Sequence, residues 1–132
     1  MLETTLLLTA LLFGGMVLYS FGFAAFVFNA LPATTAGPLI RKAFPHFYLF
    51  VFAASVLAAC TAAFFDPFSA LILALIAATT VYARQALMPA INDATDAGNK
   101  VRFKWLHTLS VLITLGHIVG AAIVIIRLGA GS

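Results

Sequence analysis

The sequence predicts an all-α integral membrane protein, a single domain built as a bundle of four transmembrane helices. Composition is the first reason: 64% of the 132 residues are hydrophobic and only 8% are charged, whereas a soluble domain carries about a quarter charged residues. The second reason is that four apolar segments are each long enough for a span of about 20 residues. The third is that most cations gather on one side of these segments, as is typical of membrane proteins.

The first predicted span covers residues 5–31 and is expected to stay in the protein. Glu3 stands where a cleavable signal peptide needs a cation. The apolar run is also longer than the core of such a signal, which is about 7–15 residues. Pro32 follows the span and ends it.

The first loop, residues 32–45, is expected to hold a short helix that lies on the membrane surface. Pro38 suits the first turn of such a helix, and apolar residues follow it on one face. Arg41 and Lys42 would then lie at the level of the lipid head groups. Pro45 is expected to end this helix and to begin the next span.

The second predicted span, residues 46–65, carries a ridge of small side chains. Ala54, Ala58 and Ala62 recur every four residues and so share one helix face. Small residues let a neighbouring helix approach closely, which is how helices associate in lipid. We therefore expect this ridge to be a packing face.

The third predicted span covers residues 67–88 and forms an antiparallel hairpin with the second. Asp66 suits the position before a helix and Pro67 the first helical position. Pro89 is expected to kink or end the span. Residues 90–100 are polar and are expected to leave the bilayer.

The fourth predicted span, residues 101–128, has two different contact faces. Gly116 and Gly120 form a GxxxG spacing that favours close helix packing. On the opposite side, a polar stripe falls within an arc of about 80° at 100° per residue. The stripe consists of Phe103, His107, Ser110, Thr114 and His117. Since polar groups that face lipid are costly, the stripe should face protein or water.

The charges predict how the bundle is oriented. Six cations fall on the side of the two longer loops and one, Arg127, on the side of the termini. This bias places the long loops in the cytoplasm and both termini in the periplasm of a bacterial inner membrane. The expected membrane-surface anchors are Arg41, Lys42, Arg102, Lys104 and Trp105.

Four ionisable residues are candidates for a ligand, solute, proton, haem or metal site. His107 and His117 are ten residues apart, about 15 Å along a helix, so they cannot share one metal ion or haem. His46 begins the second span at the depth of His107, and this pair is a candidate for haem or metal binding. His117 lies near mid-membrane, where it either bonds a hydroxyl group or serves a solute path. Arg84 either reaches the head groups, pairs with Asp93 or Asn29, or contacts an anion.

Several activities are disfavoured by what the sequence lacks. It has no CxxC, HExxH, GxSxG, phosphate-loop or dinucleotide motif and only four acidic residues, so hydrolysis and phosphoryl transfer are not expected. Its single cysteine cannot form an intrachain disulfide. The cations flank membrane segments, so the expected partner is the lipid bilayer and not nucleic acid.

Three local patterns resemble the transmembrane-protein-205-like family of small four-helix membrane proteins. They are Ala36-Gly37-Pro38-Leu39 followed by Lys42-Ala43-Phe44-Pro45-His46-Phe47-Tyr48, then Met88-Pro89-Ala90-Ile91, then Phe103-Lys104-Trp105-Leu106-His107-Thr108-Leu109-Ser110. The resemblance implies a four-span bundle and singles out Pro45, Pro89, His107 and Ser110. It implies no established reaction, since the family's domain is of unknown function.

Three functional hypotheses follow. The first is a non-enzymatic accessory or assembly subunit that acts through helix–helix contacts with itself or with other membrane subunits. The second is binding or transport of a small solute, metal or lipid by the polar stripe together with Arg84. The third is a haem- or quinone-linked redox protein that uses His46 and His107.

Overall fold

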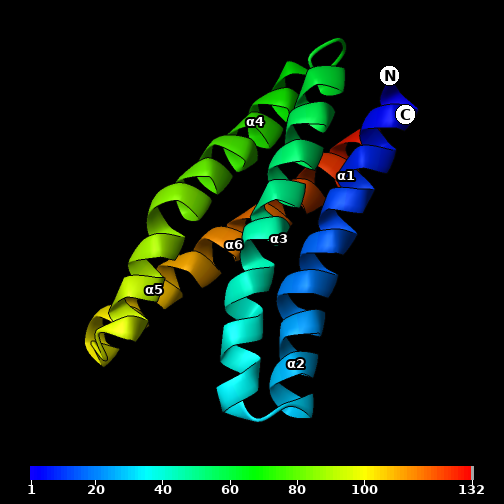
Figure 1. The fold of residues 1–132 in the computed structure, drawn as a ribbon. Helices are drawn as coiled ribbons and strands as arrows, with labels where there is room; N and C mark the ends of the chain where they lie inside the picture. Colours follow the sequence, from blue (N-terminus) through cyan, green and yellow to red (C-terminus); the bar gives the residue numbers. More distant parts are fainter. Residues whose placement is uncertain (132) are drawn as a thin grey trace.

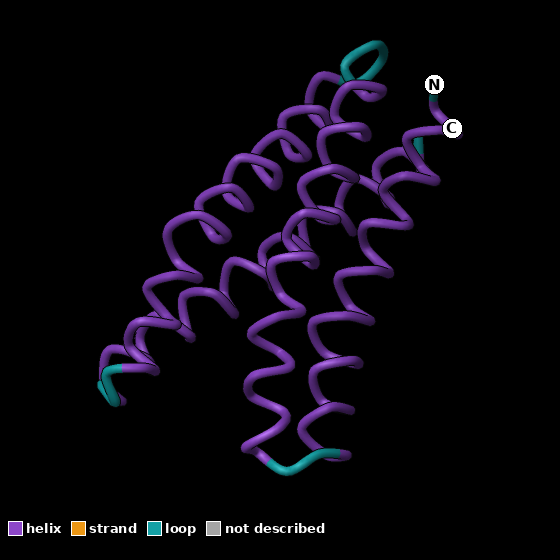
Figure 2. Tube along the Cα trace, in the orientation of Figure 1, coloured by secondary structure: helices purple, strands orange, loops and turns teal. Residues whose placement is uncertain are grey.

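The computed structural model, which describes residues 1–131, confirms the predicted all-α class. Four helical runs are long and apolar enough to cross a membrane (Figures 1 and 2). Two runs contain a π-helical turn, η1 in the first and η2 in the third. The elements are α1 (Leu2–Val17), η1 (Leu18–Phe23), α2 (Ala24–Ala30), α3 (Ala33–Ala62), α4 (Pro67–Tyr82), η2 (Ala83–Leu87), α5 (Met88–Asp96) and α6 (Lys100–Ala130).

The four runs alternate in direction. Both termini lie near the α3–α4 turn at one end of the molecule, and the other two loops lie at the opposite end (Figure 1). At the terminal end, α1 packs on α3 and α6, and α4 also packs on α3 and α6. At the loop end, α2 packs on α3 while α5 packs on α6, and the two pairs diverge (Figure 1). We call these pairs the α2–α3 arm and the α5–α6 arm.

The core runs between the helices at the terminal end and in the middle of the bundle. It includes Leu12, Met16, Val51, Leu73 and Val124, each at most 1% exposed. The expected small-residue ridge, Ala54, Ala58 and Ala62, is buried in this core. Many large apolar side chains on the outer faces are exposed instead, as expected where the surroundings are lipid.

The prediction of a separate short surface helix in the first loop is wrong. Helix α3 begins at Ala33 and continues through Pro38 and Pro45 to Ala62. A proline removes one backbone hydrogen bond, and membrane helices tolerate this where neighbouring groups bond the backbone. The carbonyl that Pro45 leaves without its helical donor is that of Arg41. Nearby carbonyls of α3 are bonded by side chains of other runs: Tyr19 donates to that of Ala43 at 2.8 Å, and Arg84 to that of Pro45 at 3.2 Å.

The third run also continues further than expected. It reaches Asp96, so residues 90–96 are helical and not part of a loop. Pro89 crowds the carbonyl four residues earlier, which belongs to Gln85 within the wider turn η2. Gly98, with a φ of 68°, then makes the reversal into α6, because glycine adopts this left-handed conformation without strain. Asn99 caps α6 by accepting from the backbone N–H of Arg102 at 3.1 Å.

An ion pair joins α6 to the α3–α4 turn at the terminal end. Arg127 donates to both carboxylate oxygens of Asp66, at 2.9 and 3.2 Å, and its guanidinium lies 4.6 Å from the ring centre of Phe68. Ser69 donates to the same carboxylate at 2.6 Å. The hydrogen bonds from Arg127 and then Ser69 lower the pKa of Asp66 to about 2. The turn is therefore held in place by a charged contact with the last helix.

Candidate functional site: a cavity between the two arms

A cavity of about 670 Å³ lies between the α2–α3 arm and the α5–α6 arm. This volume is in the range of sites for small molecules. Its apolar wall combines aromatic and aliphatic residues, and polar groups from all four helical runs interrupt it. The aromatic lining is Phe21, Phe28, Phe44, Tyr48 and Phe103; the polar lining is Ser20, Arg41, Asn92, Thr95, His107, Ser110 and Thr114.

Four residues of the predicted stripe meet on the α6 wall of this cavity: Phe103, His107, Ser110 and Thr114. The ring of His107 stacks on that of Phe103, with centroids 5.3 Å apart and planes 18° apart. The hydroxyl of Ser110 donates to the carbonyl of His107 at 2.7 Å. This part of the stripe therefore faces the space between the two arms, and the Ser110 hydroxyl is already bonded to its own helix.

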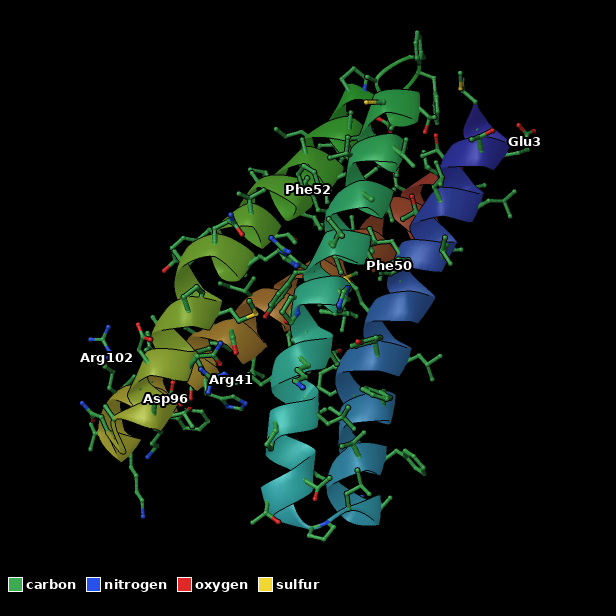
Figure 3. The ribbon with its side chains drawn as sticks, in the orientation of Figure 1. Glu3, Arg41, Phe50, Phe52, Asp96 and Arg102 are labelled. Carbon is green, nitrogen blue, oxygen red and sulfur yellow. The ribbon has the colours of Figure 1, made fainter. Side chains whose placement is uncertain are left out.

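Arg41 connects the two arms. Its guanidinium donates two hydrogen bonds to the carboxylate of Asp96, at 2.7 and 2.9 Å (Figure 3). The side chains of Arg41 and Asp96 are 44% and 60% exposed, so the pair lies at the surface. Arg41 belongs to the cavity lining, and Asp96 does not. The expectation that Arg41 serves only as a membrane-surface anchor is therefore incomplete.

His117 is separate from the cavity. It is buried, and its Nε2 atom lies 2.6 Å from the hydroxyl oxygen of Thr79 on α4. The structure thus divides the predicted stripe: its first members line the cavity, while the last joins α6 to α4. A bond to a hydroxyl group was one of the expected roles of His117.

Arg84 does not join the stripe. Its Nε donates to the carbonyl of Pro45, and its Nη1 donates to the side-chain oxygen of Gln85 at 2.9 Å. Within residues 1–131, it makes no ion pair with Asp93 and no hydrogen bond to Asn29. Arg84 instead bridges η2 and the proline-containing part of α3.

His46 and His107 are not brought to one site. His46 lines a second cavity of about 710 Å³, with Tyr19, Phe47 and other apolar residues of α1, η1, α2 and α3. His107 lines the first cavity. Among residues 1–131 there is also no group of three His, Cys, Asp or Glu side chains that could hold a metal ion. The geometry therefore does not support a haem held between these two histidines.

The two glycines of α6 have different surroundings. A Cβ atom on Gly120 would lie 3.2 Å from Ile72 and 3.4 Å from Ile76 of α4, whereas Gly116 has open space around it. Of the two glycines in the GxxxG pattern, Gly120 therefore packs closely against α4 and Gly116 does not. The remaining expected anchors, Lys42, Arg102, Lys104 and Trp105, are exposed at the loop end, and Arg102 points away from the bundle (Figure 3).

Three polar residues of the cavity lining were not singled out from the sequence: Ser20, Asn92 and Thr95. Asn92 and Thr95 lie in α5, in the stretch that was expected to form a polar loop. Polar residues recur three positions apart in this stretch, from Asn92 to Thr95 and from Asp93 to Asp96. This spacing was the available sign of a helix. Ser20 lies in η1 and donates to the carbonyl of Met16, and nothing in the sequence marks this π-helical turn.

The comparisons with known proteins identify a family but no activity. The family DUF4149, a domain of unknown function, matches residues 7–100. That range includes the cavity walls from η1, α2, α3 and α5 and ends where α6 begins. No curated protein and no solved structure matches.

Proposed function

Because this chain belongs to the DUF4149 family, whose function is unknown, we propose a function from its geometry: the protein binds a small amphiphilic molecule inside the membrane. One observation carries this proposal, the cavity between the two arms. Its lining combines an aromatic wall with polar groups from separate helices. Such a combination is typical of sites that enclose an apolar body and orient it by a few polar contacts.

The polar groups of the cavity differ in how far they are already satisfied. Ser20, Thr95 and Ser110 donate their hydroxyl protons to carbonyls of their own helices. The Asn92 amide and the His107 ring have no hydrogen-bond partner among the described residues. Both line the cavity near the loop end, together with Arg41. We therefore assign the polar part of the ligand to this end and its apolar part to the aromatic wall.

Two glycines provide a matched test. Gly37 lines the cavity and Gly116 does not. Both are helical, and at both positions a Cβ atom would have no neighbour within 4 Å. Gly37→Phe should fill the cavity, while Gly116→Phe adds the same side chain elsewhere. The probes are radiolabelled dodecyl phosphate, dodecanol and dodecyltrimethylammonium, measured on protein in phosphatidylcholine nanodiscs.

At least one probe should bind saturably to the natural protein and to Gly116→Phe, and about tenfold or more weakly to Gly37→Phe. Absence of saturable binding of all three probes, or equal effects of the two substitutions, would contradict the proposal. Circular dichroism and size-exclusion profiles of both variants show whether the fold is retained.

An accessory or assembly subunit is the second candidate. The observation in its favour is the open space around Gly116 on α6, where a helix of another subunit or of a second copy has room to pack. Gly116→Leu should then change the native mass of the particle extracted from its own membrane. An unchanged mass would remove this candidate.

The location and the finer family relationship also belong to this proposal. For a bacterial inner-membrane protein, the excess of cations at the loop end supports cytoplasmic long loops and periplasmic termini. The motifs around Pro45, Pro89 and His107 support a relationship to the transmembrane-protein-205-like family. Reporter fusions to the C-terminus test the orientation, because only a periplasmic terminus activates alkaline phosphatase.

A further inference from the structure

We infer that the amphiphile carries an anionic head group, a phosphate or a carboxylate, and that this head group replaces Asp96 as the partner of Arg41. This inference rests on the proposed function and names the ligand class of the same cavity. The starting point is that Arg41 is both a cavity residue and one half of an ion pair whose other half lies outside the cavity lining.

The geometry of the pair shows which groups fit. Arg41 presents two N–H donors side by side and holds both oxygens of Asp96. A guanidinium fork of this kind matches a carboxylate or a phosphate equally well. The Asp96 carboxylate thus occupies the place on Arg41 that a ligand's acidic head group would take.

The exchange costs little because the pair is exposed. Ion pairs at the surface contribute little to stability and are screened by salt. The unpaired Asn92 amide and His107 ring line the same cavity from the α5–α6 arm and are available as further donors.

The charge of the surroundings favours an anion over a cation. At the loop end, residues 33–44 and 88–105 hold five cations but only two carboxylates. They are Arg41, Lys42, Lys100, Arg102 and Lys104, against Asp93 and Asp96. A surplus of positive charge around a cleft raises the local concentration of anionic ligands. It also attracts anionic lipids of the adjoining leaflet.

The experiment compares head groups on a constant chain. In phosphatidylcholine nanodiscs, the natural protein should bind dodecyl phosphate more tightly than dodecanol or dodecyltrimethylammonium. Arg41→Gln should weaken dodecyl phosphate by about tenfold or more and leave dodecanol unchanged. Asp96→Asn should instead strengthen dodecyl phosphate by about two- to fivefold, because Arg41 no longer has a competing partner.

The control variants separate this exchange from simpler effects. Asp93→Asn removes the same charge from the same helix, but its carboxylate makes no hydrogen bond to Arg41, so its effect should be smaller than that of Asp96→Asn. Arg41→Lys keeps the charge and loses the fork, and its affinity should fall between those of the natural protein and Arg41→Gln. If Arg41→Gln does not fold, the affinity of Arg41→Lys still tests the inference.

Opposite effects of Arg41→Gln and Asp96→Asn support the exchange. Equal weakening by both overturns it, since a purely structural ion pair would behave in that way. Equal binding of dodecyl phosphate and dodecanol, with Gly37→Phe still blocking both, overturns the anionic head group but leaves the proposed function intact. Arg41-dependent binding of inorganic phosphate alone, as tight as that of dodecyl phosphate, overturns the amphiphile and identifies a free anion as the ligand.

Discussion

The Nε2 atom of His117 lies 2.6 Å from the hydroxyl oxygen of Thr79, so that a buried histidine of α6 is held by α4. Thr79 also donates to the carbonyl of Leu75 at 2.7 Å, and this geometry suits an Nε2–H that donates to the threonine oxygen. In this part of the bundle, α6 contacts α4 in two ways. His117 makes the polar contact, and one turn later Gly120 lies close to Ile72 and Ile76. Both contacts can be measured separately from ligand binding.

His117→Ala and Thr79→Val should each lower the free energy of unfolding, and their effects should be coupled. Hydrogen bonds between membrane helices show coupling energies of about 0.6 kcal/mol, up to about 1.7 kcal/mol. A double-mutant cycle in detergent, with unfolding followed by circular dichroism, measures this value. Thr108→Val, at an exposed position of α6, is the control. A coupling energy of zero would mean that the contact is not formed.

Gly120→Leu should destabilise the bundle by about 1–3 kcal/mol, because an added side chain meets Ile72 and Ile76 of α4. Gly116→Leu, one turn away and in open space, should leave the unfolding midpoint nearly unchanged. Both values come from the same unfolding assay. Equal tolerance of the two substitutions would show that α4 does not approach α6 at Gly120.

Tyr19→Phe should lower the free energy of unfolding by about 0.5–1.5 kcal/mol. The substitution keeps the ring that stacks on Phe47, with centroids 5.0 Å apart, and removes only the bond to the Ala43 carbonyl. Tyr82→Phe is the control, since Tyr82 is half exposed and has no hydrogen bond among the described residues. If both variants unfold alike, the bond near Pro45 adds nothing to stability.

The Asp66–Arg127 pair predicts a particular dependence on pH. The pKa of Asp66 is lowered to about 2 in the folded protein, from an ordinary value of 3.8. A lowered folded pKa stabilises the protein above the ordinary value, and this contribution is lost as the pH falls from about 4 towards 2. Asp66→Asn should therefore unfold more easily than the natural protein at pH 7, and the difference should shrink towards pH 2. A difference that stays constant from pH 7 to 2 would contradict the prediction; Asp93→Asn is the control.

The outline of the fold was predictable because lipid imposes strong rules on a sequence. Four long apolar runs and the Asp66-Pro67 turn predicted four helices and a hairpin, and the structure has both. The ridge of Ala54, Ala58 and Ala62 was expected to pack, and it is buried. In each case the sequence signal is local and repeats at the helical period.

The boundary expected at Pro45 was wrong because membrane helices tolerate proline in their interior. Pro45 was expected to separate a surface helix from a span, but α3 continues through it. Side chains of the first and third runs, Tyr19 and Arg84, bond the carbonyls near that position. Pro89 was expected to kink or end the third span; it directly follows the wider turn η2 and α5 continues to Asp96. A proline is a local signal, whereas the course of the helix through it also depends on how the helix packs.

The sequence by itself specified the membrane environment, the four helices and the polar face of α6, because burial in lipid and helical periodicity are properties of each segment alone. The tertiary structure decided which polar residues act together. It divided the stripe between a cavity at His107 and a contact at His117, placed His46 in another cavity, and paired Arg41 with Asp96 across two arms. The physical reason is that helical period sets the direction of a side chain on its own helix, while its partner depends on how the helices pack, and here the arms diverge.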